Sequence, residues 1–337
     1  MKKNIKLLLL STILTTIIYL PNVFAAAKIL DRELITIDGK QVTKLYTNEV
    51  TNEKKNTGTA GFIKLTVDGV TKTGFCVDFG VAIDPGTATV SEIEEYFAKG
   101  ISEEKAKELV KKLTEYLKFG YGNDGKTSKK YYLATQKLIW EAISDTGYYA
   151  TSYYDSVNGS SLGKLKLKNF QWTTDGKTAI DLSNEINAIE TAIENYYKKP
   201  SFCSSQEKIE IEVGETAEYI DSNGVLSMYE VNCDNGIECQ VEDNKLKVKA
   251  INEAGSNNIR FSKIDTTQTN SYVYKGGQGV IVKSGNLEPV SCEFGIDSFK
   301  NEKTADMKII YVITIGLFGG IMAYIAYYTK KSLDGLN

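Results

Sequence analysis

The sequence predicts an α+β domain, built on a β-sheet or sandwich with inserted helices, then an all-β immunoglobulin-like sandwich and a C-terminal transmembrane helix. Up to about residue 200, strand-like alternation is mixed with amphipathic helical repeats. Beyond it, only short alternating runs separated by turn residues follow. The segment 309–328 then contains twenty residues without a charge, which is long enough to span the hydrocarbon core of a bilayer.

The N-terminus has the pattern of a signal peptide. Lysines in MKKNIK precede a largely apolar run, and Val23-Phe24-Ala25 ends in the small-residue pattern that signal peptidase cleaves. We therefore expect an exported chain, in which disulfides are permitted. The expected organisation is a signal peptide at 1–25, a first domain at 26–200, a sandwich at 201–293, a linker at 294–307, a transmembrane helix at 308–329 and a cytoplasmic tail at 330–337.

The composition excludes several classes of function. The chain has 337 residues with 40 Lys and Arg against 43 Asp and Glu, so it lacks the basic excess on which nucleic-acid binding is built. It contains no histidine, which excludes His-assisted nucleophiles and removes the commonest zinc ligand. We expect no nucleic-acid partner, no metal and no cofactor.

The first domain is expected to begin with strands and continue with helices. The run GFIKLTVDGVTKTGFCVDF (61–79) alternates around the turn Asp68-Gly69 and predicts a hairpin. Residues 148–172 have no clear period and are expected to be mostly loop or short strands. Helices are expected at 90–100, 102–120, about 131–144 and 179–199, the last closed by Pro200.

The second domain is predicted from seven short runs that alternate between apolar and polar residues. They read KIEIEV, MYEVNC, ECQVED, KLKVKA, NNIRFSK, SYVYK and GVIVKS, and they favour an immunoglobulin-like sandwich. Four of the five cysteines fall around this module. We predict the pairs Cys203–Cys292 and Cys233–Cys239, and two other pairings remain open.

The fifth cysteine, Cys76 in GFCVDF, has no partner left. Strand alternation places it on the same face as Asp78. In the helix LATQKLIWEAIS, Gln136 lies on the apolar stripe with Trp140. A thiol and a primary amide held together in an apolar pocket can condense, with loss of ammonia, to an internal thioester that reacts with amines. From the residues alone, an inert buried thiol and a surface glutamine are the alternatives.

Three motifs follow one another along the first domain: Phe75-Cys76-Val77, KFGYGND (118–124) and Thr135-Gln136-Lys137-Leu138-Ile139-Trp140. Together they resemble the thioester domains of Gram-positive surface adhesins. The resemblance covers about 42–199 and implies the thioester-domain fold, with a Cys76–Gln136 crosslink supported by Phe75, Thr135 and Trp140. From strand geometry alone, Asp78 is a candidate to orient or activate an incoming amine.

The resemblance implies a covalent adhesin that captures an amine, such as a lysine of a host or surface protein, in one self-consuming acyl transfer. Such a protein is not a turnover enzyme. We expect a single-pass membrane protein at the cell surface with an extracellular N-terminal ectodomain. No Leu-Pro-x-Thr-Gly-like motif precedes the apolar helix, so an envelope component or partner subunit is an alternative target. A noncovalent binding module or pilus-like subunit is the main competing function, and an exported cysteine hydrolase would lack a histidine base.

Overall fold

A computed structural model of the protein describes residues 27–48, 52, 54–149, 167–204, 209–251, 255–265 and 270–300. The expected signal peptide at 1–25, transmembrane helix at 308–329 and tail at 330–337 lie outside these residues. Within the described ranges, no helix is long and apolar enough to cross a membrane.

The described residues form two units. The first contains the residues up to Tyr196 together with the segment Asp265–Glu288, and the second contains Tyr197–Ile264 with the residues from Pro289 onward. The chain passes from the first unit to the second after Tyr196, close to the expected domain boundary at residue 200. The assignment of Asp265–Glu288 to the sandwich is wrong, because its two strands complete the main sheet of the first unit.

The main sheet of the first unit has seven strands in the order β8-β1-β6-β7-β18-β17-β9. It therefore joins the N-terminal strands to two strands that come about two hundred positions later. Two smaller sheets, β10-β4-β5 and β2-β3, belong to the same unit. The main-sheet strands are β1 (Ala27–Leu34), β6 (Gly61–Val67), β7 (Val70–Cys76), β8 (Gly86–Thr87), β9 (Thr89–Glu92), β17 (Tyr272–Gly276) and β18 (Gln278–Val282). The smaller sheets consist of β2 (Thr36–Ile37), β3 (Lys40–Gln41), β4 (Thr43–Asn48), β5 (Lys54–Thr59) and β10 (Leu167–Thr173).

The predicted hairpin is confirmed as β6 and β7. Its turn residues Asp68 and Gly69 have φ values of 51° and 76°, as a two-residue turn with both central residues left-handed requires. The ladder runs from Val67 opposite Val70 to Ile63 opposite Gly74. Cys76 is thus the last residue of β7, beyond the end of its pairing with β6.

All four predicted helices are present. Serine caps begin the two long ones: Ser102 accepts a hydrogen bond from the backbone N–H of Lys105, and Ser128 accepts one from Tyr131. Phe119 ends one of them and is followed by Gly120. The helices are α2 (Ile93–Ala98), α3 (Glu103–Phe119), α4 (Lys129–Asp145) and α6 (Ser183–Tyr197).

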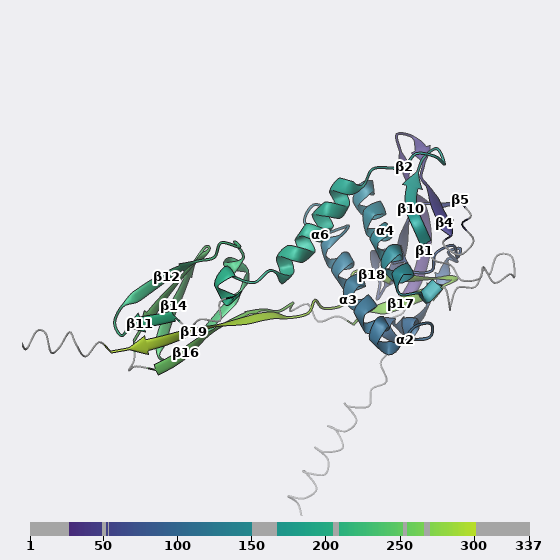
Figure 1. Ribbon diagram of the computed structural model, residues 1–337. Coiled ribbons are helices and arrows are strands. Elements are labelled where there is room, and N and C mark those ends of the chain that lie inside the picture. The colour runs from purple at the N-terminus through teal and green to yellow at the C-terminus, as the bar shows by residue number, and fades with distance from the viewer. Residues whose placement is uncertain are drawn as a thin grey trace, which may run out of the picture. The chain divides into compact units, whose positions relative to one another are not determined.

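Helix α4 lies in the middle of the first unit. It contacts α3, β7 of the main sheet and β10 of the three-stranded sheet, an arrangement that can be followed in Figure 1. The indole N–H of Trp172 on β10 donates to the backbone oxygen of Leu133 on α4. Phe79, Trp140 and Phe170 pack edge to face with ring centroids 4.9–5.6 Å apart. This aromatic cluster fixes α4 against the end of β7.

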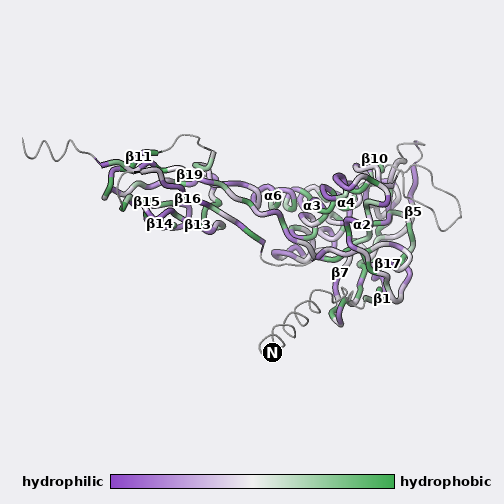
Figure 2. Tube along the Cα trace, turned by 90° about the horizontal axis from the view of Figure 1, so that it is seen from below, coloured by the Kyte–Doolittle hydropathy of each residue, from purple (hydrophilic) through white to green (hydrophobic). Residues whose placement is uncertain are grey.

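The second unit consists of two sheets, ordered β11-β19-β16-β13 and β12-β15-β14. Buried and exposed residues alternate along β15 and β16, so apolar and hydrophilic stretches follow one another in Figure 2. The expected strands at 271–275 and 279–284 are not part of this unit; β12 and β19 occupy it instead. The start of the expected linker at 294–307 is wrong, because residues 294–299 belong to β19.

The strands of the second unit are β11 (Ile209–Glu212), β12 (Thr216–Ile220), β13 (Glu230–Cys233), β14 (Ile237–Glu242), β15 (Lys245–Ala250), β16 (Gly255–Lys263) and β19 (Val290–Phe299). Two short 3-10 helices, η1 (Ser201–Ser204) and η2 (Leu226–Met228), complete it.

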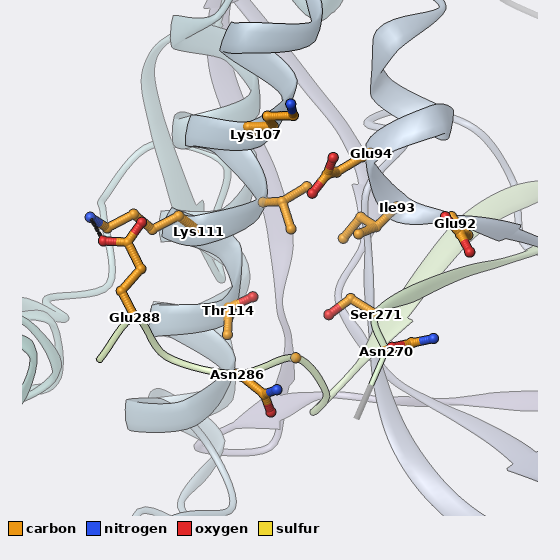
Figure 3. A pocket seen from close by; sticks show the side chains of 12 residues that line it. Glu92, Ile93, Glu94, Lys107, Lys111, Thr114, Asn270, Ser271, Asn286 and Glu288 are labelled. Atoms are coloured by element: carbon orange, nitrogen blue, oxygen red, sulfur yellow. Dashed lines mark hydrogen bonds and ion pairs between the residues drawn. The ribbon is translucent and has the colours of Figure 1, made fainter. Parts of the chain in front are cut away.

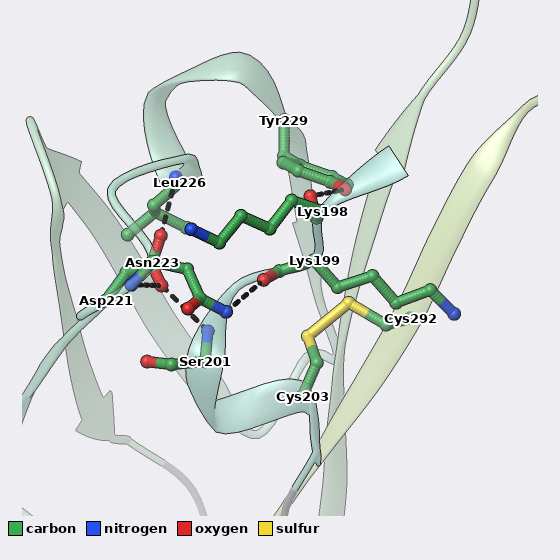
Figure 4. Close-up of a disulfide and its surroundings, with 9 residues drawn as sticks. All are labelled: Lys198, Lys199, Ser201, Cys203, Asp221, Asn223, Leu226, Tyr229 and Cys292. Atoms are coloured by element: carbon green, nitrogen blue, oxygen red, sulfur yellow. Dashed lines mark hydrogen bonds between the residues drawn. A yellow bond between two sulfur atoms is a disulfide. The ribbon is translucent and has the colours of Figure 1, made fainter. Parts of the chain in front are cut away.

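Both predicted disulfides are confirmed. Cys203 and Cys292 have Cα atoms 5.9 Å apart and join η1 to β19, as Figure 4 shows. Cys233 and Cys239 join β13 to β14 and therefore tie the two sheets together. Because 89 positions separate the first pair, it closes a long loop, worth about 4–5 kcal/mol in the chain-entropy model. Beside it, the carboxylate of Asp221 accepts hydrogen bonds from backbone N–H groups that include that of Ser201.

Candidate functional site

The unpaired thiol of Cys76 is held at the buried end of β7. The residue is 4% exposed and is the free cysteine of the described residues. Its Sγ lies 2.8 Å from the side-chain oxygen Oε1 of Gln278 and 3.1 Å from the backbone oxygen of Asp78. The side-chain amide of Gln278 is therefore the amide that contacts the sulfur.

Gln278 begins β18, the strand that pairs with β7 in the main sheet. The register places Val280 opposite Cys76, and every residue of β18 is buried. Close packing requires glycine on both strands: a Cβ at Gly74 would lie 2.4 Å from Val280, and one at Gly279 would lie 2.8 Å from Val77. Gln278 is not among the site residues predicted from the sequence, because the run GVIVKS that follows it was assigned to a sandwich strand. The available signal is a glutamine leading an apolar run of strand residues, where a buried amide requires a partner.

Gln136 contacts the backbone of Cys76. Its Oε1 accepts a hydrogen bond from the Cys76 N–H, and its Nε2 donates to the Cys76 carbonyl oxygen, both at 2.8 Å. The amide thus replaces a neighbouring strand at the point where the β6–β7 ladder has ended. The predicted Cys76–Gln136 pair does meet in space, but the amide of Gln136 is engaged with backbone groups, and the amide at the sulfur is that of Gln278.

Three side chains of α4 at intervals of four residues face the end of β7. The hydroxyl of Tyr132 lies 3.1 and 3.0 Å from the backbone oxygens of Gly61 and Gly74, at the last rung of the β6–β7 ladder. Gln136 follows one turn later and Trp140 one turn after that. This face of α4 therefore fixes the backbone on which the thiol is mounted.

The remaining predicted residues support the site from outside it. The Thr135 hydroxyl accepts from the backbone N–H of Tyr121, and a Cβ at Gly120 would lie 2.4 Å from its Oγ1, so Thr135 fastens the turn between α3 and α4. Phe75 stacks on Tyr132 with centroids 4.9 Å apart. Both residues position elements around the thiol.

Asp78 is buried and fully engaged. Its carboxylate accepts hydrogen bonds from the Tyr96 hydroxyl at 2.7 and 2.8 Å and from the backbone N–H of Gly279 at 2.6 Å. Gly279 directly follows Gln278, so Asp78 anchors the strand that carries the second glutamine. This arrangement favours a positioning role over the expected activation of an amine.

A small cavity adjoins Cys76 and Gln278. Its volume is about 40 Å³, and the basic side chains of Arg32 and Lys44 line it, whereas no carboxylate does. Burial, together with the negative charge of Asp78, raises the pKa of the Cys76 thiol from 9.0 to about 12. The thiol is therefore held in its neutral form in an enclosure that admits little more than one water-sized group.

The indole of Trp140 also lines this cavity. Its Nε1 is buried and has no hydrogen-bond partner among the described residues. The N–H favours the ionised form of Cys76, because it lowers the pKa of that thiol against the larger effect of burial. A buried N–H without an acceptor costs about 1–3 kcal/mol, so a function for it is worth seeking.

A larger cavity in the first unit, of about 540 Å³, lies between α2, α3 and the segment 270–288 (Figure 3). Glu94 and Lys107 face it, as does the ion pair between Lys111 and Glu288. Neither Cys76 nor either glutamine lines it, so it is separate from the thiol site. Within the described ranges, no group of three or more acidic or sulfur side chains is placed to hold a metal ion.

Comparisons with known proteins yield one likeness to report. No family model and no curated protein matches the sequence. Among solved structures, the chain is similar to the thioester domain of the Staphylococcus aureus TIE protein, with 22% identity, a TM-score of 0.49, and coverage of 82% of this chain and 100% of that one. The chemistry of Cys76 rests on its own contacts and not on this likeness.

Proposed function

We propose that the protein is an adhesin-type thioester protein in which Cys76 and Gln278 form the internal thioester. The observation that carries this proposal is the 2.8 Å separation between Sγ and the Gln278 amide oxygen. In the condensation, Sγ attacks the amide carbon and Nε2 leaves with the thiol proton as ammonia. The product is a thioester between strands β7 and β18.

The surroundings favour this slow step in two ways. Hydrogen bonds from Gln136 to the Cys76 backbone and from Gly279 to Asp78 fix both reacting strands, which supplies proximity before reaction. Burial of the two side chains, at 4% and 6% exposure, keeps water from hydrolysing the product.

The thioester then reacts once with an amine. The amine nitrogen bonds to the acyl carbon of Gln278, the carbon–sulfur bond breaks, and the proton lost by the amine restores the Cys76 thiol. Because the acyl group is consumed, the protein makes a single covalent bond and does not turn over. A lysine side chain of a host or surface protein is the expected amine, consistent with an extracellular ectodomain anchored by the apolar segment at 308–329.

The second unit suits the role of a spacer. Its two sheets are tied together by the Cys233–Cys239 disulfide, and the Cys203–Cys292 disulfide joins η1 to β19, so the unit can serve as a crosslinked module; an immunoglobulin-like topology remains the finer proposal for it.

Intact-mass measurement of the purified ectodomain, residues 26–300, tests the proposal. We expect a mass lower than the sequence mass by one ammonia, and a peptide crosslink between Cys76 and Gln278. The deficit should be absent in Cys76→Ala and in Gln278→Met, which keeps the volume but removes the amide. Methylamine should add its full mass to the thioester form, which leaves the protein heavier than the sequence mass by one methylene group, with the amine on Gln278 and a free thiol on Cys76. A full sequence mass in fresh protein would instead favour a noncovalent binding module.

A further inference from the structure

Lys44 extends from β4 into the cavity beside the thiol. It shares that cavity with Cys76 and Gln278, and its Nζ lies 5.2 and 5.3 Å from the ring centroids of Phe79 and Trp140. The side chain is confined, because a Cβ at Gly58 would lie 2.9 Å from its Cε. Within the described part of the chain, no carboxylate pairs with Lys44.

We propose that Lys44 is the proton acceptor for the amine that attacks the thioester, an inference that rests on the proposed function. Neutral Lys44 takes the proton that the attacking nitrogen loses as it bonds to the acyl carbon of Gln278. The resulting ammonium then faces the sulfur as the carbon–sulfur bond breaks, and it returns the proton to the departing Cys76 thiolate. Lys44 ends as it began, and the net products are an amide and a thiol.

The other polar groups near the thiol cannot take this part. The chain contains no histidine. Asp78 is engaged by Tyr96 and Gly279, and the Gln136 amide is engaged by the Cys76 backbone. The cavity is lined by side chains that include Arg32, whose guanidinium has only donor groups and bonds to Thr59. Lys44 is the remaining cavity-lining group of the described residues that can both accept and return a proton.

The charges around Lys44 favour the neutral amine that this step needs. Burial, with a smaller contribution from the positive charge of Arg32 on β1, lowers the pKa of Lys44, while the Cys76 thiolate on β7 opposes the shift. Tyr132 on α4 is the other titratable side chain that lines the cavity, and burial raises its pKa, so it stays neutral. Once protonated, Lys44 stabilises the leaving thiolate, since its charge lowers the pKa of Cys76.

The test uses the thioester-bearing ectodomain and two substitutions. Lys44→Met removes the base with little change in volume, and Lys44→Arg places a permanent positive charge there that cannot accept a proton. Both variants should keep the ammonia deficit, yet add methylamine about 10²-fold more slowly than wild type, the scale of general-base catalysis. In wild type the rate should depend on two ionisations, those of methylamine and Lys44, and in the variants on methylamine alone.

Lys137→Met is the matched control. Lys137 also lies over an aromatic ring, 5.6 Å from the Phe170 centroid, but does not line the cavity. It should react at the wild-type rate. Lys44→Met should fold, because it keeps most of the side-chain volume and removes a buried polar group, and circular dichroism checks this.

Several results would overturn the role of Lys44. These are a wild-type rate and pH profile in Lys44→Met, a wild-type rate in Lys44→Arg, loss of the ammonia deficit in folded Lys44→Met, or an amide joining Lys44 itself to Gln278. If the wild-type protein shows no ammonia deficit, the proposed thioester is wrong, and so is the proposed role of Lys44.

Discussion

The side-chain oxygen of Gln278 lies 2.8 Å from the sulfur of Cys76, although 202 positions separate the two residues. The chain passes through most of the second unit between them, since Tyr197–Ile264 belong there and Asp265–Glu288 return to the first unit. The proposed reactive pair is therefore complete only after the chain has returned. Strands β17 and β18 bring Gln278 back and also supply the partner of β9.

The return of β17 and β18 predicts that a fragment covering residues 26–200 does not make a thioester. It lacks two of the seven main-sheet strands and the amide that faces the thiol. We expect it to show its full sequence mass and a melting temperature well below that of the 26–300 ectodomain. Mass spectrometry and a thermal melt of both proteins check this. An ammonia deficit in the short fragment would contradict the assignment and return the acyl role to Gln136.

Gln136 offers a second prediction, because it binds backbone groups that no strand satisfies. Gln136→Met leaves the buried N–H and C=O of Cys76 without these partners, at a cost of about 1–3 kcal/mol for each group. We expect a lower free energy of unfolding in urea and slower, incomplete thioester formation, but some ammonia deficit after long incubation. Gln278→Met should show no deficit at any time. Equal and complete loss in both variants would mean that the two glutamines cannot be separated in this way.

Trp140 offers a third prediction from its unpartnered indole N–H. Trp140→Phe keeps an aromatic ring in the cluster and removes no hydrogen bond present among the described residues, so we expect only a modest loss of stability. If the N–H serves the sulfur or the acyl oxygen during the reaction, methylamine addition should slow by about 10²-fold. Single-turnover rates and urea unfolding measure the two effects. A normal rate together with a large loss of stability would make Trp140 a packing residue alone.

The sequence was sufficient for the local elements and insufficient for the long-range pairing. Helix α4 and the hairpin β6–β7 follow from patterns within a few residues, such as the cap at Ser128 and the turn at Asp68. Both predicted disulfides are confirmed, although the cysteine spacing left two other pairings open. Alternation in GVIVKS identifies a strand but carries no information about which sheet it joins, so Gln278 was overlooked. Gln136 was correctly placed beside Cys76, yet periodicity alone cannot tell an amide bound to backbone from one aimed at the sulfur.

The burial of Cys76 predicts a specific pH dependence of stability. In Gln278→Met the thiol stays free, and burial, with the charge of Asp78, holds its pKa in the folded protein at about 12 instead of 9.0. Below pH 9 the thiol is protonated in both states and has no effect. Between about pH 9 and pH 12 the unfolded chain loses the proton while the folded protein keeps it, so the free energy of unfolding falls as pH rises, by up to about 1.4 kcal/mol per pH unit.

The double variant Cys76→Ala/Gln278→Met lacks this group, and the lysines and tyrosines that titrate in the same range cancel in the comparison. Urea unfolding of both variants under reducing conditions at pH 8, 9, 10 and 11 should give curves that coincide at pH 8 and diverge above it. Parallel profiles would show that the thiol reaches solvent in the folded protein, and rapid alkylation of Cys76 at pH 8 would then be expected as well.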